Sequence, residues 1–70
     1  MAPIRATITG TVVKVQVGAG DAVAPGDEVL LIESMKMEIP IVVEVAGRVE
    51  EVMCEEGETV QEGEILIRLA

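Results

Sequence analysis

The stretch Glu33-Ser34-Met35-Lys36-Met37-Glu38-Ile39-Pro40-Ile41 lies in the middle of the 70-residue chain. Runs rich in Val, Ile and Leu lie on both sides of it, as is typical of β-strands. The pattern therefore predicts a hairpin turn at Met35 and Lys36. Two-residue hairpin turns favour Asn, Asp or Gly, because one or both central residues need a positive φ. Met-Lys departs from this rule, and such departures concentrate where function requires them.

The composition predicts one small all-β domain that spans residues 1–70. Half of the residues are apolar, so the chain should fold, and Phe, Tyr and Trp are absent. The core must then be built from Val, Ile, Leu, Ala and Met, which suits thin, closely packed sheets. No segment shows the apolar spacing of an amphipathic helix.

The formal net charge of −8 argues against nucleic acid or anionic membranes as partners, because both attract basic proteins. A single cysteine, Cys54, leaves no internal disulfide and fits a reducing compartment. The start of the chain does not resemble a signal peptide, and no apolar run has membrane-spanning length. These features predict a cytoplasmic protein or one from another reducing intracellular compartment.

The chain contains an internal repeat at an offset of 37 residues. Residues 10–33 align without a gap onto residues 47–70, and apolar, acidic and glycine positions agree together. Recurring glycines indicate recurring backbone requirements, and we expect a positive φ at Gly26, at Gly63 or at both. The aligned pairs include Gly10/Gly47, Val12/Val49, Val15/Val52, Gly20/Gly57, Val23/Val60, Gly26/Gly63, Val29/Leu66 and Ile32/Leu69.

The repeat guides the secondary-structure prediction. Loops or turns are expected at Gly18–Asp21, Pro25–Asp27, Glu55–Glu58 and Glu62–Glu64. Strands are expected at Ile4–Thr9, Thr11–Val17, Ala22–Ala24, Val29–Glu33, Met37–Val43, Arg48–Cys54, Thr59–Gln61 and Ile65–Leu69. Alternation is clearest over residues 13–17, where Lys14 should face away from its valine neighbours.

Together these elements predict a two-halved sandwich or flattened barrel with quasi-two-fold symmetry. Lys36 should project at one end of the domain and the chain termini should lie toward the other. Pro40 suggests an edge strand or a bulge, and Cys54 should be buried. The expected inward positions are Val12, Val15, Val29, Ile32, Val49, Val52, Leu66 and Leu69.

The whole chain resembles the biotinyl/lipoyl attachment domain family. The resemblance rests on Met35-Lys36-Met37, on Glu33 three residues before the lysine, on the Gly-Asp pairs at residues 20–21 and 26–27, and on an end 34 residues after Lys36. It implies a barrel-sandwich hybrid of two four-stranded antiparallel sheets. Methionines on both sides of the lysine are similar to biotin carboxyl carriers, whereas lipoyl domains more often carry Asp before the lysine and Ala after it.

The resemblance implies that biotin is attached covalently to Lys36 by a biotin protein ligase. The domain would then be a swinging arm that moves CO2 from a biotin carboxylase to a carboxyltransferase acting on an acyl-CoA or a keto acid. Two alternatives remain open. One is a lipoyl carrier of a multienzyme complex, and the other is an unmodified β-sandwich adaptor that binds a partner protein.

Two features depart from the usual biotin carrier. Ser34 stands where Ala is common, a small change outside the turn itself. The gapless repeat leaves no room for the additional loop, or thumb, of some acetyl-CoA carboxylase carriers. The chain is therefore more similar to thumbless carriers and to small free-standing attachment proteins.

The candidate site consists of Lys36 for attachment, with Met35 and Met37 as exposed contacts for the ligase or a partner. Glu33 is a candidate for recognition by the ligase. Histidine is absent, which excludes His-based acid–base chemistry, and one cysteine without histidine leaves no zinc-type ligand set. No catalytic or metal-binding residue is predicted, so any chemistry would belong to the attached cofactor.

Overall fold

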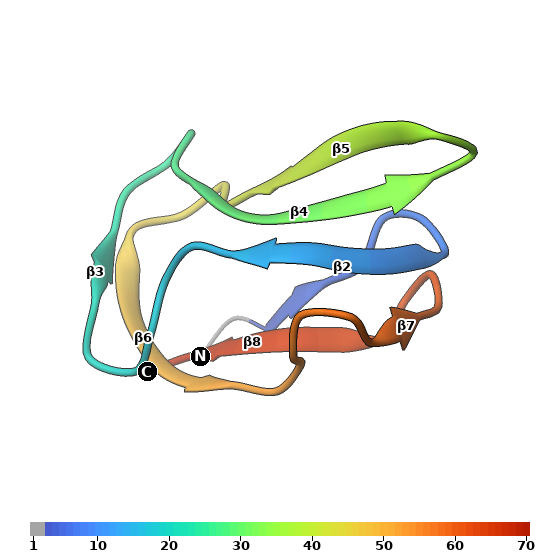
Figure 1. Cartoon of the computed structure of the whole chain (residues 1–70). Coiled ribbons are helices and arrows are strands. Elements are labelled where there is room, and N and C mark those ends of the chain that lie inside the picture. Colours follow the sequence, from blue (N-terminus) through green and yellow to red (C-terminus); the bar gives the residue numbers. More distant parts are fainter. Residues whose placement is uncertain (1–2) are drawn as a thin grey trace.

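A computed structural model describes residues 3–70 as eight β-strands joined by tight turns (Figure 1). The strands are β1 (Pro3–Arg5), β2 (Gly10–Val15), β3 (Ala22–Val23), β4 (Glu28–Ser34), β5 (Met37–Val42), β6 (Gly47–Val52), β7 (Thr59–Val60) and β8 (Ile65–Leu69). Within these residues, no helix is long and apolar enough to cross a membrane.

The strands form two four-stranded antiparallel sheets that face each other, as the sequence predicted. One sheet has the order β1-β8-β6-β3 and the other β5-β4-β2-β7. The short strands β3 and β7 each pair with a long strand from the other half of the chain. The two halves are therefore interleaved, and neither sheet is complete without both of them.

The backbone follows the predicted two-fold repeat closely. The Gly20 N–H donates to the carbonyl of Val49 at 2.8 Å, and the Gly57 N–H donates to the carbonyl of Val12 at 2.7 Å. The two hydrogen bonds are equivalent to each other, because their residues are related by the offset of 37. Each half therefore closes its loop onto a long strand of the other half, which ties the halves together.

The symmetry begins earlier in the chain than the sequence alignment indicated. Pro3 of β1 pairs with Arg68, and its counterpart Pro40 of β5 pairs with Leu31, again at an offset of 37. Residues 3–33 therefore correspond to residues 40–70. Matching prolines at positions 3 and 40 were the available signal in the sequence.

Matched β-bulges interrupt the two long strands β2 and β6. The register shifts between Val12 and Lys14 and again between Val49 and Glu51, which leaves Val13 and Glu50 as the extra residues. The predicted alternation over residues 13–17 was wrong at this point, because Val13 and Lys14 are both exposed. A bulge adds one residue and so breaks the period of two.

Several strands are shorter than predicted. β1 ends at Arg5 rather than at Thr9, although the Ala6 N–H still donates to the Glu64 carbonyl at 2.9 Å. β2 ends at Val15 rather than at Val17. Strand ends depend on where the partner strand stops, which periodicity alone does not indicate.

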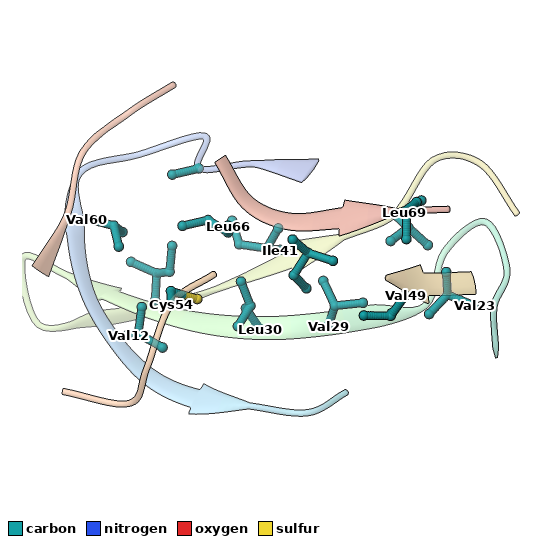
Figure 2. Packing of buried hydrophobic residues seen from close by; sticks show 14 residues of the cluster. Val12, Val23, Val29, Leu30, Ile41, Val49, Cys54, Val60, Leu66 and Leu69 are labelled. Atoms are coloured by element: carbon teal, nitrogen blue, oxygen red, sulfur yellow. The ribbon is translucent and has the colours of Figure 1, made fainter. Parts of the chain in front are cut away.

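A continuous apolar layer fills the space between the sheets (Figure 2). Six of the eight predicted inward positions are buried, whereas Val15 and Val52, which follow the bulges, are only partly buried and pack against the cluster. Burial of both Val29 and Leu30 departs from alternation, because the β4–β5 register shifts there. The buried residues are Ala6, Val12, Val23, Val29, Leu30, Ile32, Ile41, Val43, Val49, Cys54, Val60, Leu66, Ile67 and Leu69.

The outermost strands on one side, β1 and β5, each contain a proline. β5 is an edge strand, which confirms one of the two options predicted for Pro40. Along an antiparallel strand, the N–H and C=O groups of successive residues point alternately toward the partner strand and away from it. In the pair that closes the hairpin, Ser34 and Met37, these groups point toward the partner strand. The nitrogen of Pro40 therefore faces away from β4, where no ladder hydrogen bond is lost. Pro3 occupies the equivalent position in β1.

Gly26 and Gly63 both adopt a positive φ, of 93° and 90°, which confirms the prediction for these turns. A Cβ at either position would meet no atom within 4 Å, so the effect of alanine is conformational rather than steric. We expect Gly26→Ala and Gly63→Ala each to lower the free energy of unfolding by about 1–2 kcal/mol. Gly18→Ala is the matched control, because Gly18 also has open space but no positive φ. Equal stability of all three variants in urea denaturation would contradict this explanation.

Candidate attachment site

The β4–β5 hairpin closes through a turn of only two residues, Met35 and Lys36. Ser34 pairs with Met37 across the hairpin, so these two residues alone connect the strands. Both have a positive φ, 53° for Met35 and 66° for Lys36, and they are the only non-glycine residues with a positive φ in the described part of the chain. Positive values at both positions are typical of a type I′ turn. The predicted hairpin and its unfavourable local sequence are therefore confirmed.

The hairpin tip projects from one end of the sandwich, and the C-terminus lies at the opposite end (Figure 1). Met35 is 91% exposed and Met37 is 62% exposed, and the Lys36 side chain is also exposed. The predicted exposure of these three residues is confirmed. A primary amine held here can enter the active site of another protein without any change in the rest of the domain.

The hairpin register places two carboxylates opposite each other, one residue pair below the pair that closes the turn. Glu33 lies directly opposite Glu38, both are exposed, and within residues 3–70 neither forms an ion pair. Like charges directly opposite each other destabilise a strand pair. Glu38 was missed in the sequence analysis, although a two-residue turn at 35–36 places residue 38 opposite residue 33. A cationic partner surface would relieve the repulsion between these two side chains.

Lys36 lies outside the groove between the two edge strands. A groove of about 330 Å³ lies between the edge strands β1 and β5, where Ile4 and Ile41 are among the residues that line it. Neither Lys36 nor its two methionine neighbours line this groove. The candidate site is therefore a projecting turn with exposed side chains.

The second lysine occupies a different environment. Lys14 pairs with Leu31 within β2, which lies between β4 and β7 in its sheet. The Lys14 side chain is exposed, but its backbone is paired within a strand and does not project as the turn at Lys36 does. Among residues 3–70, no group of three or more His, Cys, Asp or Glu side chains is arranged to hold a metal ion.

Cys54 is buried, as predicted, and lies in the apolar layer of Figure 2. Burial raises the pKa of its thiol above the ordinary value of 9.0, and the negative charges of Glu58 and Glu64 raise it further. A raised pKa keeps the thiol protonated, and the thiolate is the reactive form. The side chain acts as a small apolar core residue.

The raised pKa of Cys54 gives a pH-dependent contribution to stability. A thiol with a higher pKa in the folded state binds its proton more tightly there, so this contribution is present below pH 9 and is lost as the pH rises through the folded pKa. We expect stability to fall at alkaline pH less steeply in Cys54→Val than in the unsubstituted chain. Circular dichroism melting curves between pH 7 and pH 11 measure this. Parallel curves for the two proteins would contradict it.

Comparison with known proteins agrees with this geometry. Residues 2–69 match the biotin/lipoyl family described as "Biotin-requiring enzyme". The chain is 49% identical over 63 residues to a biotin/lipoyl attachment protein of Bacillus subtilis, covering 90% of this chain and 86% of that protein. It is 44% identical over 66 residues to the human mitochondrial propionyl-CoA carboxylase alpha chain, covering 94% of this chain but only 9% of that one.

Two solved structures show the same fold. Urea carboxylase of Kluyveromyces lactis superposes with a TM-score of 0.91 at 28% identity, over 99% of this chain and 6% of that enzyme. The lipoyl domain of the 2-oxoglutarate dehydrogenase complex from Azotobacter vinelandii superposes with a TM-score of 0.75 at 32% identity, over 89% of this chain and 78% of that domain. The fold is thus shared by part of a carboxylase and by a lipoyl domain.

Proposed function

Because the chain belongs to the biotin/lipoyl attachment family, a family of non-catalytic carrier domains, we propose that it is a biotin carboxyl carrier with biotin attached to Lys36. The observation that carries the proposal is the exposed amine at a two-residue turn between two exposed methionines. Homology to carrier domains within carboxylases supports carboxylase partners. We further propose a reducing intracellular compartment, where Cys54 stays a thiol.

The residues at the tip fit a covalent group. The Lys36 amine would attack the activated carboxyl carbon of biotin in the ligase, form an amide, lose a proton and release the activating group. Met35 and Met37 offer soft apolar contact to the ligase or to a later partner. Glu33 and Glu38, which lie opposite each other, would present negative charge to the ligase or to that partner.

Attached biotin would supply a site that accepts CO2 from bicarbonate and releases it to an acyl-CoA or keto acid. The chain itself would supply position. The rigid sandwich holds the base of the arm, and tethering raises the effective concentration of the carried group at a second active site. Biotin protein ligase, biotin carboxylase and carboxyltransferase are the proposed partners.

Labelling followed by peptide mapping tests the assignment. The chain is incubated with ATP, biotin and a biotin protein ligase, and in parallel with lipoate and a lipoate ligase. We expect a gain of one biotin, on Lys36, and no lipoate. Lys14 is the internal control, because it is exposed but lies within a strand. Lipoate on Lys36, biotin on Lys14, or an unmodified chain would each overturn the proposal.

A further inference from the structure

Gly10 lies unusually close to the backbone at the base of the Lys36 hairpin. Gly10 begins β2, and the next residue, Thr11, pairs with Glu33, the residue of β4 that lies two positions before the turn. A Cβ placed on Gly10 would overlap the carbonyl oxygen of Glu33 and would lie 2.7 Å from Cγ2 of Ile32. Real Cβ atoms do not approach other atoms this closely, so any side chain here would push the two strands apart.

The repeat provides an internal comparison. Gly47 is the counterpart of Gly10, and a Cβ on Gly47 would lie 3.3 Å from Cδ1 of Leu69, with no backbone atom among its three nearest neighbours. The end of a leucine side chain can move, whereas a paired backbone carbonyl cannot. Of these two equivalent glycines, only Gly10, which lies beside the base of the Lys36 hairpin, has the close backbone contact.

We propose that Gly10 is a positioning residue for Lys36, seating the base of the hairpin against β2 so that the tip points in the direction the modifying enzyme requires. This inference rests on the proposed modification of Lys36. Lys36 lies only three positions after Glu33, so a displacement at the base is carried directly to the tip.

Ligase kinetics with Gly10→Ala test the proposal, with Gly47→Ala as the matched control. For Gly10→Ala we expect the KM of the ligase for the carrier to rise about tenfold or more, with kcat within about twofold. Gly47→Ala should keep the KM of the unsubstituted chain. Acetylation of Lys36 by a small water-soluble reagent should be equal in all three proteins, because the amine stays exposed in each.

The outcomes separate this inference from the function it rests on. A Gly10→Ala variant with a lower melting temperature but an unchanged KM would overturn the inference and leave a purely structural glycine. A slower reaction of Lys36 with the small reagent would also overturn it, because the defect would then not be one of presentation. An unsubstituted chain that the ligase does not modify would overturn the proposed function, and the inference with it.

Amide hydrogen exchange in the unsubstituted chain decides the matter if Gly10→Ala does not fold. A seated hairpin opens together with β2, so the amide of Met37, which pairs with Ser34, should be protected to within about tenfold of the Glu33 amide. Exchange of Met37 at the rate of an unstructured peptide, beside a protected Glu33, would show a tip that moves independently of its base. That result would overturn the proposal.

Discussion

Lys36→Arg is expected to accept no biotin at all while keeping the fold of the unsubstituted chain. Arginine retains the positive charge, but its guanidinium stays protonated and does not act as the attacking amine. The substitution lies at an exposed turn, where a side chain contributes little to packing, so the melting temperature should change little. The variant should also fail to support carboxylation when the partner enzymes are supplied. Intact mass after incubation with ligase, ATP and biotin measures the loss.

Lys14→Arg is the control for this experiment, because it removes the other lysine of the chain and leaves the hairpin untouched. It should gain one biotin at the rate of the unsubstituted chain. Biotin gained by Lys36→Arg would show that the ligase uses another residue and would end the assignment of Lys36.

Ile32→Ala is expected to cost about 2–5 kcal/mol of the free energy of unfolding, the usual range for truncating a buried aliphatic side chain. Ile32 is fully buried and lies in β4, the strand that connects the core to the hairpin. Native domains are stabilised by only about 5–15 kcal/mol, and a domain of this size should lie near the lower end. The variant should therefore lose most of its stability.

Urea denaturation followed by far-UV circular dichroism measures this effect, because the chain lacks the aromatic residues that fluorescence needs. Val42→Ala is the matched control, since Val42 lies at the end of β5 and is 46% exposed. It should change stability by about 0.5 kcal/mol or less. Similar denaturation midpoints for the two variants would refute the inward placement of Ile32.

The central hairpin could be predicted because it depends on neighbouring residues, and the symmetry because the sequence itself repeats at an offset of 37. Two apolar runs around Met35 and Lys36 leave only a short turn, and the repeated turns at Gly26 and Gly63 use a positive φ that glycine adopts without strain. The buried position of Cys54 followed from its alignment with Val17. Each of these features depends on a few neighbouring residues or on one repeat offset.

Other features depend on strands that are distant in the sequence. The two-residue strand β3 pairs with β6 and β7 with β2, and nothing in such short segments specifies the partner. The bulges at Val13 and Glu50 were not predicted, because no particular residue type marks the extra residue of a bulge. Glu38 is an exception, because the predicted two-residue turn at Met35 and Lys36 already implied that it lies opposite Glu33.

The prolines on the outer strands affect how the proposed carrier can associate with other proteins. A sheet edge with free N–H groups can capture an edge strand of another protein, and such an association is extensive and slow to reverse. Pro3 and Pro40 remove a donor from each outer strand at equivalent positions. Strand addition along β1 and β5 is therefore disfavoured, and in the proposed function the exposed tip at Met35 and Lys36 makes the contact with other proteins. Contacts of that kind are small and short-lived, which would let the proposed carrier leave a first enzyme and reach a second.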